Sequence, residues 1–144
     1  MGLHFPVKIA RVTTVLLVED DADWRVLLER RLTEEGMRPI GLARGEWTTL
    51  AVETHHPDVV VLDLHLGGLD GLEVLELVRR RWPALPVIAM TAFGGRDARE
   101  LARRRGATGF LEKPFPIAQL VSELTRATKG YNTGADPGRQ STGA

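Results

Sequence analysis

The chain has 144 residues, about the length of one domain, and its 43% hydrophobic and 26% charged residues exclude a disordered or fibrous protein. Its 19 basic and 19 acidic residues balance, so no overall charge attracts it to nucleic acid or to an anionic membrane. The absence of cysteine excludes disulfides and thiol nucleophiles. With no targeting signal and no run of ~18 apolar residues, we expect a cytoplasmic protein that binds neither membrane nor nucleic acid.

The two ends of the chain differ from its middle. Residues 1–13 show no regular period and are expected to form an N-terminal extension. Residues 128–144 are expected to be a flexible tail or a truncated linker, because the stretch from 130 onward has no large aliphatic side chain. The single domain is expected at residues 14–127, which carry 15 basic and 18 acidic residues, a net charge of −3.

Short apolar segments and amphipathic segments alternate through this domain. Strand-length apolar segments occupy residues 14–18, 38–42, 59–62, 86–90 and 108–111. Three of them are rich in β-branched residues and almost continuously apolar, which is typical of parallel strands buried on both faces. The segments between them show the helical period, as in Trp24, Leu28 and Leu32. Five such units predict an α/β fold, a doubly wound five-stranded parallel sheet with helices on both faces.

Polar side chains follow four of the expected strands. The functional crevice of an open parallel sheet lies at the carboxyl ends of its strands. The residues placed there are Glu19, Asp20, Asp21 and Asp23 after the first strand, Asp63 after the third, Thr91 after the fourth and Lys113 after the fifth. Two carboxylates 4 Å apart repel by on the order of 4 kcal/mol at an effective dielectric of 20, so a cation must neutralise them. Either Lys113 or Mg²⁺ can do so, and Mg²⁺ prefers carboxylate, water and phosphate oxygens.

Four segments together resemble the receiver domain of two-component response regulators. The resemblance covers residues 14 to about 127 and rests on 15–21 (VLLVEDD), 58–74 (DVVVLDLHLGGLDGLEV), 87–92 (VIAMTA) and 106–115 (GATGFLEKPF). It implies a flavodoxin-like sheet with strand order 2-1-3-4-5. It also implies a cytoplasmic signalling switch that accepts a phosphoryl group from a histidine kinase or a phosphotransfer protein.

The resemblance assigns a role to each polar residue at the strand ends. Asp63 resembles the phosphoacceptor, and Glu19 and Asp20 resemble the acidic pair that holds Mg²⁺. The carboxylate of Asp63 and the backbone carbonyl of His65 would complete the protein ligands of the metal. Lys113, before a usually cis proline, resembles the ammonium that pairs with the phosphoryl group. No activity beyond self-phosphorylation and self-dephosphorylation is implied, so we expect no enzyme in the ordinary sense.

A two-residue switch is implied as well. Thr91 resembles the hydroxyl that moves to the phosphoryl group, and Phe110 resembles the aromatic switch, expected to face outward before activation. The fourth helix, fifth strand and fifth helix would then change their common face, where Arg99 and Arg103 meet a partner, an output domain or a second copy of the chain.

The sequence departs from the common receiver pattern at four positions. Glu19 stands where aspartate is more frequent, and its longer side chain can still bind metal. Gly67 stands where proline is frequent, which we expect to loosen the loop after Asp63. Phe110 replaces a frequent tyrosine and offers no hydroxyl to a partner, and His65 is an unusual residue two positions after the phosphoacceptor. None of these changes removes a required group.

Several of these residues also have a purely structural interpretation. Asp20 or Asp21 could cap the first helix, and Asp70 is expected to cap the third. Thr91 could be a strand-end hydroxyl bonded to backbone, and Phe110 could be a static aromatic residue of the core. The arginine runs at 79–81 and 103–105 are expected at helix C-termini, where cations are favoured, rather than on nucleic acid.

Other functions remain open from the sequence. A phosphatase of the haloacid-dehalogenase type also uses a strand-end aspartate, Mg²⁺ and a lysine, but its general acid would stand where His65 does. An FMN-binding flavodoxin needs a glycine- and hydroxyl-rich phosphate loop after the first strand, where this chain has acidic residues. A receiver-like interaction module that is never phosphorylated is the third alternative.

Overall fold

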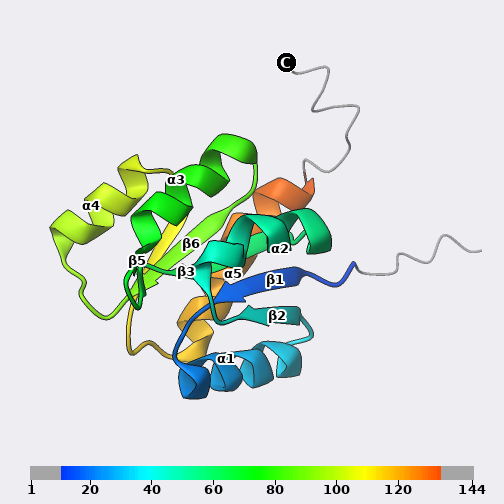
Figure 1. Cartoon of the computed structure of the whole chain (residues 1–144). Helices are drawn as coiled ribbons and strands as arrows, with labels where there is room; N and C mark the ends of the chain where they lie inside the picture. Colours follow the sequence, from blue (N-terminus) through cyan, green and yellow to red (C-terminus); the bar gives the residue numbers. More distant parts are fainter. Residues whose placement is uncertain (1–10, 134–144) are drawn as a thin grey trace, which may run out of the picture.

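A five-stranded parallel sheet forms the centre of the molecule in the computed structural model, which describes residues 11–133 (Figure 1). Its strands are β1 (Thr14–Val18), β2 (Arg38–Leu42), β3 (Val59–Asp63), β6 (Val87–Thr91) and β7 (Gly109–Glu112). They lie in the order β2-β1-β3-β6-β7, and every neighbouring pair is parallel. This arrangement confirms the predicted order 2-1-3-4-5, and each strand begins within one residue of its predicted start.

Helices connect the strands and cover both faces of the sheet. They are α1 (Ala22–Glu34), α2 (Thr48–His55), α3 (Gly71–Arg81), α4 (Arg96–Arg104) and α5 (Ile117–Thr133), with a short 3₁₀ turn, η1 (Gly45–Trp47), before α2. The chain thus contains the predicted alternation of strands and helices.

Helix α5 extends beyond the domain end predicted at residue 127. It continues to Thr133, so the first six residues of the predicted tail are helical. Thr128 is buried there and its hydroxyl donates to the carbonyl of Leu124, while Ala127 packs against the core. Composition alone missed this because a helix already formed on a sheet continues through residues that are not themselves apolar. Residues 134–144 and 1–10 lie outside the described residues.

Alternate residues of the strands face two separate apolar cores. Leu16 and Val18 of β1 face the core that α2, α3 and α4 cover, whereas Val15 and Leu17 face the core that α1 and α5 cover (Figure 1). Burial on both sides explains why these strands are nearly continuous apolar runs. The two layers of helices leave the carboxyl ends of the strands as the place where polar side chains can gather.

Aspartate side chains cap two helices next to this edge. Asp21 Oδ1 accepts the backbone N–H groups of Asp23 and Trp24 at the start of α1. Asp70 accepts the N–H of Leu72 at the start of α3. The capping interpretations of Asp21 and Asp70 are therefore confirmed, whereas Asp20 is not the cap of α1.

A small hairpin follows β3 that the sequence did not predict. Its strands are β4 (His65–Leu66) and β5 (Leu69–Asp70), joined by Gly67 with φ 42° and Gly68 with φ 73°. Positive φ at both central residues is the requirement of the tight I′ hairpin turn, which proline at position 67 could not meet. The glycine pair thus permits a defined turn, and the expectation that Gly67 loosens this loop stays a prediction.

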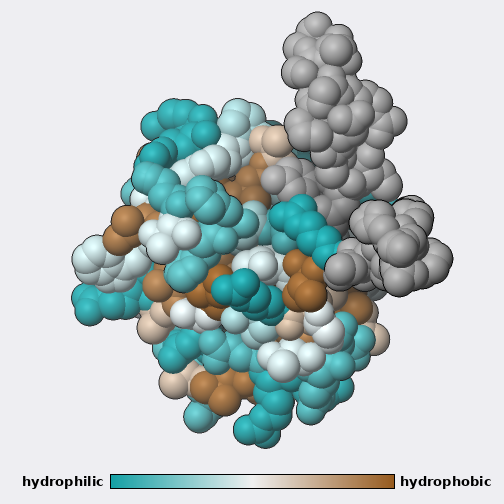
Figure 2. Space-filling model, turned by 90° about the vertical axis from the view of Figure 1, so that its right-hand side faces the viewer, coloured by the Kyte–Doolittle hydropathy of each residue, from teal (hydrophilic) through white to brown (hydrophobic). Residues whose placement is uncertain are grey.

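The outer surface is mixed in character. On the side of the molecule that Figure 2 shows, hydrophobic residues are interspersed among hydrophilic ones. Within residues 11–133, none of the helices is both long enough and apolar enough to cross a membrane.

Candidate functional site

Three carboxylates meet where β1 and β3 end. Pairing of Val18 with Leu62 places the next residues of the two strands, Glu19 and Asp63, at the same edge of the sheet. Glu19, Asp20 and Asp63 each offer an oxygen, and these oxygens lie within 4.8 Å of one another. Glu19 and Asp63 are buried, while Asp20 is exposed. The predicted acidic cluster is therefore assembled by strand register, with one side open to solvent.

Lys113 reaches this cluster from the end of β7. Its Nζ donates to Glu19 Oε1 at 2.5 Å and to Asp63 Oδ2 at 2.8 Å. Its backbone N–H donates to the carbonyl of Thr91, and the Lys113–Pro114 peptide is cis, as the resemblance implied. The ammonium thus joins the two buried carboxylates, and its side chain is only 18% exposed.

Burial and charge tune these groups in opposite directions. Burial raises the pKa of Glu19 to about 7, although the hydrogen bonds from Lys113 and from the backbone of Asp21 oppose the shift. Burial lowers the pKa of Lys113, but its hydrogen bonds to Asp63 and Glu19 outweigh this effect and leave the pKa raised. The lysine therefore stays charged. The carboxylates still repel one another, and a further cation would reduce this repulsion.

The donor set suits a hard divalent cation. With every group ionised, Glu19, Asp20 and Asp63 together with Lys113 carry a net charge of −2, which one divalent ion neutralises. Carboxylate oxygens are the ligands that Mg²⁺ prefers, so the residues present fit this metal. The hydrogen bonds leave room for it, because Asp63 Oδ1 accepts only the His65 N–H, at 2.8 Å, among the described residues. The role of the His65 carbonyl as a further ligand stays a prediction.

Thr91 lies at the same edge of the sheet but is engaged elsewhere. It ends β6, next to β3, where Asp63 pairs with Met90. Its side chain is fully buried, and its hydroxyl is hydrogen-bonded to His65 and to the backbone of Phe93. The structure therefore brings Thr91 to the edge predicted for it, with its hydroxyl held by residues outside the acidic cluster.

Phe110 is buried, contrary to the expectation that its ring faces outward. Only 6% of the residue is exposed, and it packs in the core beneath α4 with Ala89 and Ala102. The guanidinium of Arg99 lies over the ring, 5.0 Å from its centre. The small side chains of Ala89 and Ala102 leave space for the ring, which a pattern read along one strand could not reveal.

Two aromatic side chains at the site were not predicted to take part in it. The Trp24 ring lies 5.9 Å from the Lys113 ammonium and meets the ring of Phe115 edge-on. The imidazole of His65 contacts Thr91 and meets the ring of Phe93 edge-on. Helical periodicity marked Trp24 only as a core residue. The unusual identity of His65 was the sole signal in the sequence that its side chain mattered.

Comparison with known proteins agrees with this geometry. Residues 15–125 match the response regulator receiver domain family. The DNA-binding transcriptional regulator NtrC of Klebsiella pneumoniae is 38% identical over 121 residues, covering 84% of this chain and 26% of NtrC. The transcriptional regulatory protein PdtaR of Mycobacterium tuberculosis H37Rv is 35% identical over 118 residues, covering 81% of this chain and 57% of PdtaR. The chain thus spans about a quarter of the NtrC relative.

Solved structures show the same likeness. The receiver domain of NtrX from Brucella abortus superimposes with a TM-score of 0.75 at 33% identity, covering 80% of this chain and 98% of that one. A CheY-like receiver protein from Methanospirillum hungatei superimposes with a TM-score of 0.81 over 87% of this chain and all of the other, and its 18% identity speaks for the fold alone. The predicted fold is confirmed, and the chain belongs to the receiver domains of two-component response regulators.

Proposed function

We propose that Asp63 accepts a phosphoryl group from a histidine kinase or a phosphotransfer protein, with Mg²⁺ held by Glu19, Asp20 and Asp63. The observation that carries this proposal is the Lys113 ammonium placed between two buried carboxylates, with a third carboxylate open to solvent beside them. Such a site keeps a net negative charge that a metal ion would neutralise. Its Asp20 side is open to solvent, so a phosphoryl donor can approach there.

The chain's own residues divide the chemistry between them. A carboxylate oxygen of Asp63 forms a bond to phosphorus while the phosphorus–nitrogen bond of the donor breaks. Lys113, already within hydrogen-bond distance of Asp63, stabilises the negative charge of the transferred group. Bound Mg²⁺ supplies further charge neutralisation and orients phosphoryl oxygens. Attack of water on the acyl phosphate later returns free phosphate, so the protein acts on its own side chain and on no separate substrate.

The response to phosphorylation would pass from Thr91 to the face formed by α4, β7 and α5. Thr91 and Ala89 face the same side of β6, and Ala89 pairs with Phe110 on β7. A hydroxyl drawn toward a phosphoryl group therefore changes the packing next to Phe110 and beneath α4. Arg99, Arg103 and Gln119 on this face would then meet an output domain, a partner protein or a second copy of the chain.

Phosphorylation of defined variants tests the proposal. Incubation with acetyl phosphate or a phosphohistidine kinase domain, with Mg²⁺, should add one phosphoryl group to the intact protein in mass spectrometry. Asp63→Asn and excess EDTA should each abolish the added mass. Asp70→Asn is the matched control, because Asp70 is an exposed helix cap, and it should be phosphorylated normally.

Two results would contradict the proposal. Added mass that survives Asp63→Asn places the phosphoryl group elsewhere. A wild-type protein that accepts no phosphoryl group from either donor acts instead as an interaction module that is never phosphorylated.

A further inference from the structure

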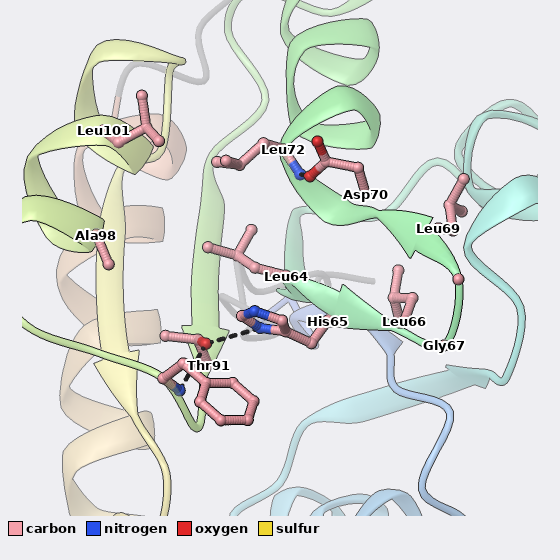
Figure 3. A pocket seen from close by; sticks show the side chains of 12 residues that line it. Leu64, His65, Leu66, Gly67, Leu69, Asp70, Leu72, Thr91, Ala98 and Leu101 are labelled. Carbon is pink, nitrogen blue, oxygen red and sulfur yellow. Dashed lines mark hydrogen bonds between the residues drawn. The ribbon is translucent and has the colours of Figure 1, made fainter.

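The hydroxyl of Thr91 already makes two hydrogen bonds. Its Oγ1 lies 2.9 Å from His65 Nδ1 and accepts the backbone N–H of Phe93 at 3.0 Å (Figure 3). The bond to Phe93 closes a local turn of the kind that threonine often forms two residues along the chain. The bond to His65 is different in kind, because it joins residues 26 positions apart and crosses from β6 to the β4–β5 hairpin.

The direction of the second bond depends on the tautomer of His65. A threonine hydroxyl has one hydrogen to donate and two lone pairs that accept, so Oγ1 can donate to Nδ1 or accept from an Nδ1–H while it accepts the N–H of Phe93. Thr91 is fully buried, so no solvent competes for these bonds. In either direction the bond holds the hydroxyl that Thr91 would offer to a phosphoryl oxygen.

The imidazole is fixed in this position by its neighbours. The His65 ring meets the Phe93 ring edge-on, with 4.8 Å between the ring centres. The backbone N–H of His65 donates to Asp63 Oδ1, which ties the same residue to the phosphoacceptor. His65, Thr91 and Phe93 also line a cavity of about 650 Å³. Ala98 and Leu101 of α4 line the same cavity, so a change in the contacts of Thr91 alters the packing beneath that helix (Figure 3).

We propose that the His65 side chain is a latch that retains Thr91 in the inactive state. Resting on the proposed function, this assigns His65 a positioning role: the Thr91–His65 bond must break before the hydroxyl can bind a phosphoryl group on Asp63. The latch opposes activation, so its removal favours the active arrangement. His65 and the phosphoryl group compete for one hydroxyl, and the strength of the existing bond sets part of the equilibrium between the two states.

Removing the ring nitrogen without removing the ring isolates the latch. His65→Phe keeps an aromatic ring that can pack on Phe93 but has no nitrogen to form a hydrogen bond with the hydroxyl. His65 is exposed, so the variant should fold, which thermal unfolding checks. The net free energy of a neutral intramolecular hydrogen bond corresponds to a change of about fivefold in an equilibrium constant. The variant should therefore bind beryllofluoride, a phosphoryl mimic, about fivefold more tightly in the presence of Mg²⁺.

Calorimetric titration of four variants separates the latch from other effects. His55→Phe makes the same substitution at an exposed histidine on α2 and should leave beryllofluoride affinity unchanged. In a Thr91→Val background the hydroxyl is absent, so adding His65→Phe should change the affinity by less than about twofold. The affinity for Mg²⁺ alone is measured in wild type and in His65→Phe as well. The substitution keeps the backbone carbonyl of His65, which is the predicted metal ligand, so a gain caused by the latch should appear with beryllofluoride and not with Mg²⁺ alone.

NMR of the free protein gives a readout that does not depend on phosphorylation. The ¹⁵N shift of His65 Nδ1 should report its hydrogen bond to Thr91 in wild type. Thr91→Val should shift the tautomer equilibrium, whereas the His55 resonances should stay unchanged.

The outcomes distinguish the latch from the proposed function. The latch is overturned if His65→Phe binds beryllofluoride no more tightly than wild type, if the gain persists in the Thr91→Val background, or if Mg²⁺ affinity changes by the same factor. A wild-type protein that binds beryllofluoride normally while failing any of these tests leaves the proposed function standing. A wild-type protein that neither binds beryllofluoride nor accepts a phosphoryl group overturns the proposed function, and the latch with it.

Discussion

Glu19 combines a charged side chain with complete burial. Its neighbours are one ammonium, from Lys113, and two further carboxylates, from Asp20 and Asp63. Burial and the nearby negative charge of Asp63 raise its pKa, while Lys113 and the backbone of Asp21 lower it. Without a metal ion the carboxylates repel one another, and this repulsion lowers the stability of the folded protein. Asp20 adds to this repulsion and is exposed, so its carboxylate can be removed without disturbing the core.

Asp20→Ala is expected to raise the stability of the metal-free protein and to abolish its response to Mg²⁺. One negative charge is removed from the cluster, so the melting temperature in EDTA should rise by about 3 °C. Wild type should gain stability with Mg²⁺ according to its saturation, whereas the variant should not. Differential scanning calorimetry with and without Mg²⁺ measures both effects.

The matched control is Asp23→Ala, which removes an exposed carboxylate of α1 outside the cluster. It should keep the full Mg²⁺ response. An unchanged Mg²⁺ response in Asp20→Ala would show that Asp20 is not a metal ligand.

At the scale of the elements, Arg79 joins the ends of three of them. It lies in the last turn of α3, and its guanidinium donates to the carbonyls of Pro83 and Leu85 before β6 and of Gly106 after α4. Burial lowers the pKa of this guanidinium. The arginine run that the sequence placed at a helix C-terminus thus contains one residue that fastens loops at the end of the sheet opposite the site.

Arg79→Met should lower the free energy of unfolding by about 2–3 kcal/mol, because carbonyls that now accept from a charged donor would lose their partner. Chemical denaturation gives this value directly. Phosphorylation of Asp63 should persist under conditions where the variant is folded, since Arg79 lies far along the strands from their carboxyl ends.

Arg80→Met is the control for this change. Arg80 is exposed, so its replacement should alter the free energy of unfolding by less than about 0.5 kcal/mol. Equal losses in both variants would mean that the carbonyl contacts of Arg79 contribute nothing specific.

At the scale of the whole molecule, the edge strand β7 connects the site with the α4–β7–α5 face. Thr91 is hydrogen-bonded at the carboxyl edge, and Phe110 lies on the neighbouring strand under the Arg99 guanidinium. Phe110 is already buried, so activation cannot consist of burying an exposed ring. The change that remains available is a repacking of Phe110, Arg99 and α4 within the same core.

Binding of beryllofluoride with Mg²⁺ should therefore shift NMR resonances in two regions. The loops around Asp63 should respond directly, and Phe110, Arg99 and α4 should respond through the packing. Resonances of α1, on the opposite core, are the internal reference and should move least beyond its first turn. Shifts that stay confined to the loops around Asp63 would show that no switch operates across this face.

The sequence by itself determined the succession of strands and helices and the polar edge of the sheet, and the resemblance to receiver domains added the strand order. Apolar runs such as residues 59–62 are local signals, because a strand buried on both faces must be apolar throughout. A charged residue directly behind such a run, as at Asp63, has few explanations other than a site. The same reasoning places Glu19 and Lys113 at the same edge, since parallel strands end on one side.

The tertiary structure alone decided how the side chains at that edge are engaged. The burial of Phe110 depends on segments distant in the chain, because Ala89 of β6 and Ala102 of α4 belong to the same core. The hydrogen bond of Thr91 to His65 spans 26 residues and exists only because β6 and the hairpin lie side by side. Periodicity reports which face of an element is apolar, whereas these features depend on which element packs against that face.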